Sequence, residues 1–221
     1  MIALSSRETA DYGATVQREW LVTNGIGGYA MGAVNGTRTR RYHGLLVAAL
    51  QPPVGRWLMA GSVFDSLLVG DSEYAFTGAA RHDGRRVAVS RAARGMRFAL
   101  DGTTPIWTFK TPRLHVEKRV FMAYGQNTTY VRYTLLRAVA PVRLRGTVTA
   151  ALRDHHQLSH ASDAPHPQYE PVENGLRVRV TPDAAPLSLL CGAMALTPAL
   201  RWHQHEYLAV EDERGFDCLD D

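Results

Sequence analysis

Apolar residues alternate with polar ones along several short segments of this chain, and this two-residue period constrains the fold more than any other feature. Successive side chains of a β-strand point to opposite faces, so an alternating segment predicts a strand with one buried face. The clearest example is the range 113–123, where one face would carry Leu114, Val116, Val120 and Met122. The ranges 129–136 and 176–180 alternate in the same way, as half-exposed antiparallel strands do.

Lys118 interrupts the apolar face of the range 113–123, because it occupies a place in the alternation that a core residue would take. Two explanations fit the sequence. Either the amine of Lys118 reaches across to a carboxylate, or a β-bulge reverses the pleat of the strand there.

Turns rich in Gly, Pro and Asn separate these segments, and many short strands between such turns are typical of an antiparallel sandwich. Further strands are expected at 187–191 and 203–210, whereas the weak helical period at 7–12 is discounted. The sequence therefore predicts an all-β fold, a large antiparallel β-sandwich. The chain has 221 residues, of which 45% are hydrophobic, so we expect a single domain with its own core over residues 1–221.

The overall charge and the cysteine content argue against several classes of protein. The net charge is only +4, whereas proteins that read nucleic acid carry a broad basic stripe. No run approaches the roughly 20 apolar residues of a membrane helix, and the first residues lack the pattern of a signal peptide. Cys191 and Cys218 have no spacing typical of a metal motif or a disulfide framework. We expect a cytoplasmic protein with neither nucleic acid nor a membrane as a partner.

The range 19–44 is the most unusual part of the sequence. A short apolar strand, 20–22, runs into a turn, 24–28, that is too rich in glycine for a helix or a strand. Glycine tolerates positive φ angles and lets another backbone or a ligand approach closely. A dinucleotide-binding loop would need a helix after the glycines, and Gly32 and Asn35-Gly36 disfavour one. We therefore interpret the glycines as tight turns of the sandwich.

Seven segments carry an unusual and ordered set of residues. They are 19–30 (EWLVTNGIGGYA), 39–48 (TRRYHGLLVA), 52–56 (PPVGR), 116–122 (VEKRVFM), 125–129 (GQNTT), 153–156 (RDHH) and 213–217 (ERGFD). This order resembles the start of the archaeal and bacterial type of glycogen debranching enzyme. The resemblance spans nearly the whole chain.

The resemblance implies a non-catalytic N-terminal domain, a supersandwich as in glucoamylase-like N-terminal domains. In that family an (α/α) barrel follows in the same polypeptide and carries the carboxylates that hydrolyse α-1,6-glucosidic branch points, the amylo-alpha-1,6-glucosidase activity. The domain would then help to bind an α-glucan such as glycogen and would support the barrel. A stand-alone carbohydrate-binding module and an interaction domain without sugar affinity remain alternatives. Both a chain truncated before the barrel and a naturally short protein fit the sequence.

No residue of the chain is predicted to be catalytic. Glycoside hydrolysis needs two carboxyl groups roughly 5–10 Å apart, and no pair is marked out by spacing among Asp154, Glu170, Glu206 and Asp217. We therefore expect the chain alone to be inactive, without a cofactor.

The histidines after Asp154 raise the possibility of a metal site. This group comprises His155, His156, His160 and His166. On a strand, His155 and His156 would point to opposite faces and could not bind one ion together. We therefore expect no metal, and interpret these side chains as hydrogen-bonding groups.

The substrate-binding or domain-interface residues are expected in stretches that combine turns with rings and polar groups. Rings suit the C–H faces of a sugar, and charged or amide groups suit its hydroxyls. The candidates are Trp20, Asn24, Gly25, Gly27, Gly28, Tyr29, Arg40, Arg41, Tyr42, His43, Asp154, His155 and His156. For residues 40–43, a structural or interface role and direct contact with sugar both remain open. Trp107 is a further ring of the same type.

The loops around Gly27, Arg41 and His155 are expected to share one exposed face, which the barrel would cover. Exposed apolar patches are uncommon on true monomers, so the chain alone should self-associate through this face. Alanine at Arg41 or His155 is expected to leave the melting temperature almost unchanged.

Overall fold

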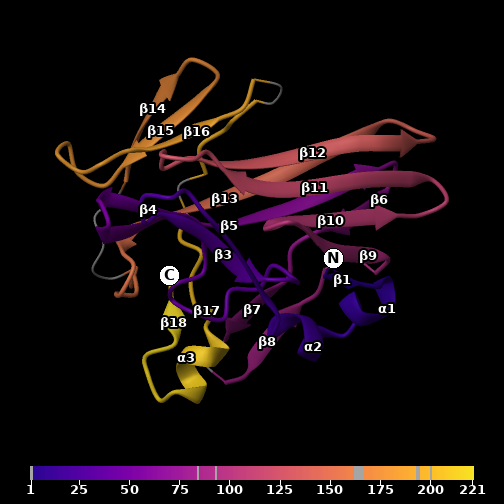
Figure 1. Cartoon of the computed structure of the whole chain (residues 1–221), viewed down its shortest axis with the longest axis horizontal. Coiled ribbons are helices and arrows are strands. Elements are labelled where there is room, and N and C mark those ends of the chain that lie inside the picture. The colour runs from indigo at the N-terminus through magenta and orange to yellow at the C-terminus, as the bar shows by residue number, and fades with distance from the viewer. Residues whose placement is uncertain (1, 84, 93, 162–166, 193–194, 200) are drawn as a thin grey trace.

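The computed structural model of the protein describes residues 2–83, 85–92, 94–161, 167–192, 195–199 and 201–221. Strands account for 53% and helices for 7%, and the strands form several antiparallel sheets (Figure 1). The prediction of an all-β fold is confirmed.

Two large sheets form the centre of the molecule. The five-stranded sheet has the order β1 (Ala3–Leu4), β9 (Met96–Asp101), β10 (Thr104–Lys110), β11 (Leu114–Met122) and β12 (Thr129–Ala138). The six-stranded sheet has the order β13 (Val142–Asp154), β5 (Val54–Val69), β4 (Gly44–Gln51), β3 (Tyr29–Ala33) and β2 (Glu19–Thr23), with β6 (Ser72–Ala75) paired to β5.

The main hydrophobic core lies between these two sheets, because alternate residues of both point inward. Trp20 and Val22 of β2 pack in one buried cluster with Trp107 and Phe109 of β10. The rings of Trp20 and Trp107 meet edge to face, with 5.5 Å between their centroids. The packing of the two inner faces makes this part of the fold a sandwich.

Lys118 keeps its place in the alternation of β11. It is buried together with Val116 and Val120, and the irregularity in the pairing of β11 with β12 lies earlier, between His115 and Val116. The amine of Lys118 lies 2.7 Å from the carboxylate of Asp65, on β5 of the opposite sheet. Of the two explanations for Lys118, the contact with a carboxylate is confirmed.

A smaller sheet covers the other face of the six-stranded sheet. It consists of β14 (Gln168–Val172), β15 (Gly175–Arg179) and β16 (Leu187–Leu190). Leu187 of β16 packs with Ala48, Met59, Ala60 and Leu152 in a second buried cluster. The six-stranded sheet is therefore the middle layer of three.

A fourth sheet joins the last residues of the chain to its first half. Its order is β18 (Leu219–Asp220), β17 (Glu206–Tyr207), β7 (Ala79–His82) and β8 (Val87–Ser90). Figure 1 shows β17, β18 and helix α3 (Ala209–Glu213), in yellow, below β3 and β4. The expected strand 203–210 is thus limited to residues 206–207, and α3 begins two residues later.

Two short helices near the N-terminus contradict the discounting of residues 7–12 as helical. They are α1 (Ser6–Thr9) and α2 (Tyr12–Val16). Ser5 and Glu8 form a reciprocal capping box on α1, and the side chain of Asp11 accepts a hydrogen bond from Ala14 N at the start of α2. Caps rather than an apolar stripe favour these helices, since each is too short to show periodicity. In the described part of the chain, no helix has the length and hydropathy needed to cross a membrane.

Candidate functional site

Arg41 and Tyr42 lie against the residues that follow β13, more than a hundred positions later in the chain. Arg41 Nη1 donates to the backbone oxygen of His156 over 3.0 Å. The hydroxyl of Tyr42 lies 3.2 Å from His156 Nδ1, and the Tyr42 ring centroid is 5.5 Å from that of His155 and 5.7 Å from that of His156. We call Tyr42, His155 and His156 the ring cluster.

The rings of His155 and His156 lie on the same side, with 4.0 Å between their centroids. The prediction that they point to opposite faces is wrong, because β13 ends at Asp154. Asp154 instead accepts a hydrogen bond from His156 N over 2.8 Å and thereby shapes the turn. Among the described residues, no group of three or more His, Cys, Asp or Glu side chains is placed to hold a metal ion. His166 lies outside the described residues.

His155 is neutral at pH 7 in this surrounding. Burial lowers its pKa, and the neighbouring His156 lowers it further. Its Nδ1–H donates to the backbone oxygen of Arg56 over 3.1 Å, so Nε2 carries a lone pair that can accept a hydrogen bond from a hydroxyl.

Arg56 connects the ring cluster to the glycine turn. Its backbone oxygen accepts from His155 N over 3.2 Å, and its Nε donates to the oxygen of Gly27 over 2.6 Å. Tyr29, which follows the turn, donates from its hydroxyl to the backbone oxygen of Tyr42 over 3.2 Å. The structure therefore brings the three predicted loops, around Gly27, Arg41 and His155, into one contiguous region.

Asn24 organises the glycine turn from within. It is fully buried. Its Oδ1 accepts hydrogen bonds from Ile26 N over 3.1 Å and from Gly28 N over 2.9 Å. Its Nδ2 donates to Gln126 O and to Asn127 Oδ1, both over 3.0 Å. All four hydrogen-bonding positions of this amide are used. Asn24 is therefore a scaffold for the turn and has no group left for a ligand.

The glycines of this turn are required by backbone angles and by space. Gly25 and Gly27 have φ angles of 80° and 100°. A Cβ at Gly25 would lie 2.4 Å from the ring of Tyr124, and a Cβ at Gly27 would lie 2.7 Å from the oxygen of Pro53. At Gly28, a Cβ would lie 2.5 Å from Asn24 Nδ2.

Tyr124, on the turn after β11, was not predicted from the sequence. Its ring lies over Gly25 and is 86% exposed. Val54, Leu50 and Trp57 of the adjoining β4–β5 hairpin are also exposed. The sequence offered one signal for Tyr124, a large ring next to the predicted turn 125–127. The exposure of this ring could not be predicted, because it depends on how the loops pack together.

Trp20 does not belong to this region. Its ring is 6% exposed, and Trp107 is equally buried in the same core. The burial of both rings corrects the expectation that they could meet a sugar.

Arg40 and His43 direct their side chains to Glu19, at the start of β2. Arg40 Nε and His43 Nε2 lie 2.6 and 3.0 Å from Glu19 Oε1. His43 Nδ1 accepts from Thr39 N over 3.2 Å, so the proton of the neutral ring is on Nε2 and is donated to Glu19. The hydrogen bond from His43, followed by that from Arg40, lowers the pKa of Glu19 to about 2 despite its partial burial.

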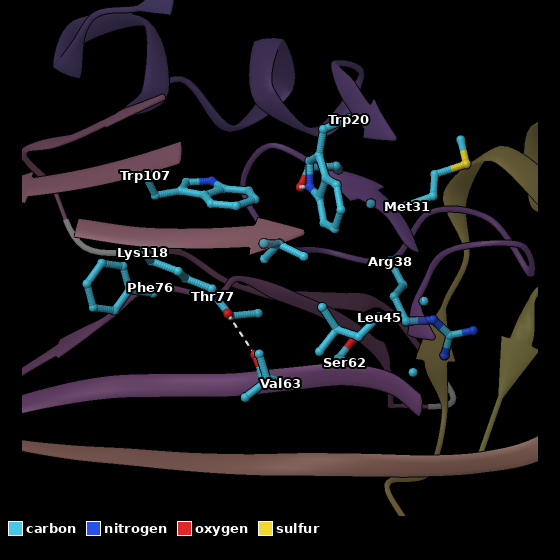
Figure 2. A pocket seen from close by; sticks show the side chains of 16 residues that line it. Trp20, Met31, Arg38, Leu45, Ser62, Val63, Phe76, Thr77, Trp107 and Lys118 are labelled. Carbon is cyan, nitrogen blue, oxygen red and sulfur yellow. Dashed lines mark hydrogen bonds between the residues drawn. The ribbon is translucent and has the colours of Figure 1, made fainter. Parts of the chain in front are cut away.

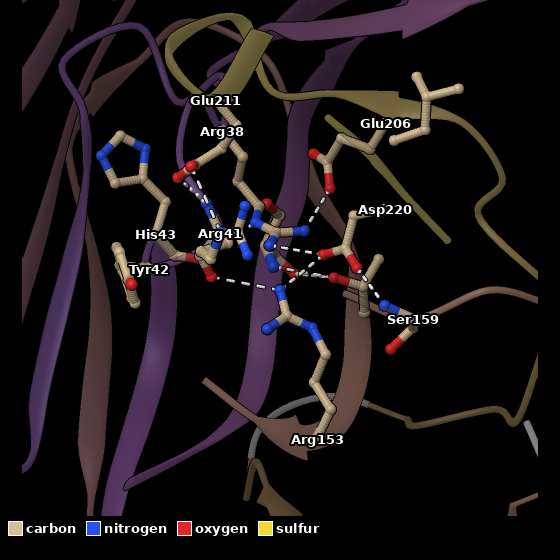
Figure 3. Close-up of polar contacts among 12 residues, drawn as sticks. Arg38, Arg41, Tyr42, His43, Arg153, Ser159, Glu206, Glu211 and Asp220 are labelled. Carbon is tan, nitrogen blue, oxygen red and sulfur yellow. Dashed lines mark hydrogen bonds and ion pairs between the residues drawn. The ribbon is translucent and has the colours of Figure 1, made fainter. Parts of the chain in front are cut away.

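A buried ion-pair network fastens the C-terminal segment, residues 206–221, to the sandwich (Figure 3). Arg38 lies 2.6 Å from Glu206 and 2.8 Å from Asp220, and Arg153 lies 2.8 Å from the same oxygen of Asp220. Burial alone would lower the pKa of Arg38, but Glu206 and Asp220 outweigh it and raise that pKa. Burial also works against the charge of Asp220, yet Arg38 and Arg153 hold its pKa below the usual value. Glu206 is thus a structural partner.

Arg41 belongs partly to this network. Its Nε lies 3.3 Å from the buried carboxylate of Glu211 on α3, and its guanidinium carbon lies 5.5 Å from the ring centroid of the exposed Phe216. Alanine at Arg41 would leave Glu211 without this partner. We therefore expect Arg41→Ala to lower the melting temperature measurably instead of leaving it almost unchanged. We expect the same of His155→Ala, because His155 is buried.

The cavity between the two large sheets is too small for a sugar. The cavity between Trp20, Phe76, Trp107 and Lys118 has a volume of about 40 Å³ (Figure 2). Small-molecule sites occupy about 300–1,000 Å³, so this cavity suits only water. A glucan would therefore not fit in this cavity.

The comparison with known proteins gives one match. A sequence model of the family described as "Glycogen debranching enzyme N terminal" matches residues 18–221. No curated protein and no solved structure matches the chain.

Proposed function

The chain belongs to the family of glycogen debranching enzyme N-terminal domains, and from this premise we propose that it is a non-catalytic domain that helps to bind an α-glucan. The catalytic carboxylates of the amylo-alpha-1,6-glucosidase would lie in an (α/α) barrel of the same polypeptide, which this domain supports. A cytoplasmic location, with no cofactor, suits such an enzyme.

The convergence of Arg41, Tyr42, His155 and His156 carries the proposal for glucan binding. Tyr42 and His156 offer rings for the C–H faces of a sugar, and the buried ring of His155 packs against both. The Arg41 guanidinium, held by Glu211, offers further donors in a fixed orientation.

Titration of the chain with maltooligosaccharides tests this proposal. Because Tyr42 would contribute a stacking ring, Tyr42→Ala should weaken binding about tenfold, the equivalent of about 1.4 kcal/mol. Tyr169→Ala is the matched control, since Tyr169 is an exposed ring on β14 of the separate three-stranded sheet. A flat titration with the unmodified chain would favour the alternative, an interaction domain without sugar affinity.

The exposed side chains around the glycine turn carry the proposal of a covering domain. Tyr124 and Val54 are 86% and 65% exposed at neighbouring loops, which is costly for apolar groups in water. We infer that the catalytic domain covers them. In a protein containing both domains, Tyr124 should be protected from chemical modification, whereas modification equal to that of the separate chain would contradict the inference.

A further inference from the structure

A second hollow lies between the N-terminal helices and the segment that leads into β9. Its volume is about 280 Å³, close to the lower end of the range of about 300–1,000 Å³ for small-molecule sites. Two alanines line it together with Thr9, Tyr12, Thr15, Asn35, Arg91 and Arg94. It lies apart from the ring cluster and shares no residue with it.

The charge of this hollow is positive. No lining residue is acidic, and within the described part of the chain neither Arg91 nor Arg94 forms an ion pair with a carboxylate. Arg38, Arg41 and Arg153, by contrast, each lie within ion-pair distance of one. Two guanidinium groups without a counter-charge at one concave site are suited to an anion.

Asn35 adds a buried donor to the lining of the hollow. The residue is 7% exposed, and its Oδ1 accepts from Thr37 N over 3.0 Å. Its Nδ2 has no partner among the described protein atoms. Buried polar atoms without a partner are rare in native proteins and call for an explanation such as a ligand or bound water.

Tyr12 gives the hollow a flat wall. The guanidinium carbon of Arg91 lies 6.0 Å from its ring centroid, so the positive charge and the ring are adjacent. A ligand with an anionic end and a saturated ring would meet both.

We propose that this hollow binds a phosphate monoester of a small sugar. Arg91 and Arg94 would hold the phosphate through guanidinium forks, which match its oxygens in pairs. The sugar would lie against Tyr12 with Asn35 within reach of its hydroxyls. Free phosphate shares the chemistry of the anionic end, whereas a neutral sugar lacks it.

Calorimetric titration at low ionic strength with inorganic phosphate, glucose 6-phosphate and glucose tests the proposal. The ester should bind more tightly than phosphate, because it also fills the rest of the hollow, and glucose should not bind measurably there. The double substitution Arg91→Gln with Arg94→Gln should weaken binding of the ester at least tenfold. Its matched control, Arg137→Gln with Arg143→Gln, removes the same charge from exposed arginines of β12 and β13, outside the hollow, and should leave the affinity unchanged.

A direct readout comes from NMR of the unmodified chain, which avoids dependence on folding of the variants. The side-chain amide signals of Asn35 should shift saturably with the ester. The proposal is overturned if neither anion binds saturably, if both double variants lose affinity equally, or if phosphate binds as tightly as the ester. These outcomes do not depend on maltooligosaccharide binding at the ring cluster.

Discussion

Asp220 keeps two arginines charged inside the protein, and its carboxylate is the partner they share. Asp220→Ala should lower the free energy of unfolding by about 3–5 kcal/mol. The substitution leaves Arg38 with one carboxylate partner, Glu206, and leaves Arg153 with no carboxylate partner among the described residues. Urea denaturation measures the loss. Asp71→Ala, at an exposed turn, is the control and should stay within about 0.5 kcal/mol of the unmodified chain. A loss below about 1 kcal/mol at Asp220 would show that solvent or rearrangement replaces the network.

His43 should make stability depend on pH. Burial lowers its pKa below the usual value of about 6.5, against the opposing effect of Glu19. The unfolded chain therefore takes up a proton at a pH where the folded chain does not, so this part of the stability is complete above about pH 6.5 and is lost as the pH falls through the folded pKa. Unfolding free energies between pH 7.5 and 5 should fall more steeply for the unmodified chain than for His43→Gln. Equal slopes for the two proteins would show that His43 does not cause the dependence of stability on pH.

Single residues also show what a sequence can and cannot reveal. The position of Lys118 on the apolar face could be read from the sequence, which left a contact with a carboxylate and a β-bulge as its two explanations. Arg38, Arg153, Glu211 and Asp220 were missed, since partners that lie far apart in sequence leave no local pattern. Trp20 was misassigned because a ring looks the same in sequence whether it faces a ligand or a core.

At the scale of elements, the glycine turn between β2 and β3 is tightly constrained by both its backbone angles and its neighbours. Gly27→Ala combines a φ of 100° with a contact of 2.7 Å to backbone, so it should cost clearly more than the roughly 1–2 kcal/mol of a left-handed alanine alone. Gly125→Ala measures the cost of the left-handed backbone alone, because Gly125 has a φ of 72° and nothing within 4 Å of an added Cβ. Thermal unfolding of the two variants gives the comparison. Similar costs would mean that the β4–β5 turn moves aside.

The elements that the sequence predicted well are the alternating strands. β10 and β11 bury the expected residues Trp107, Phe109, Leu114, Val116 and Val120, because a two-residue period with one buried face leaves few alternatives. In β12 the alternation did not predict burial, since Leu135 is 54% exposed. The short helices were not predicted, since four or five residues are too few to display a period of 3.6. The range 203–210 looked like a strand, but Val210 N donates to Thr39 O, and this tertiary contact belongs to α3.

At the scale of the whole molecule, the exposed side chains near the glycine turn should make the chain associate with itself. Sedimentation velocity should show a concentration-dependent dimer, which Tyr124→Ser together with Val54→Ser should weaken. Tyr130→Ser, an exposed ring on the edge strand β12, is the control for loss of a ring elsewhere. Dimerisation that depends on Tyr130 instead would place the contact at the sheet edge.

The ion pairs of Arg38 also set an order of events during protein synthesis. Its partner Glu206 lies 168 positions later, and ribosomes add about 5–20 residues each second. Arg38 therefore leaves the exit tunnel about 8–34 s before Glu206 does. Until then, closing the six-stranded sheet around Arg38 would bury an unpaired guanidinium, so the nascent chain should remain open and accessible to chaperones over that interval.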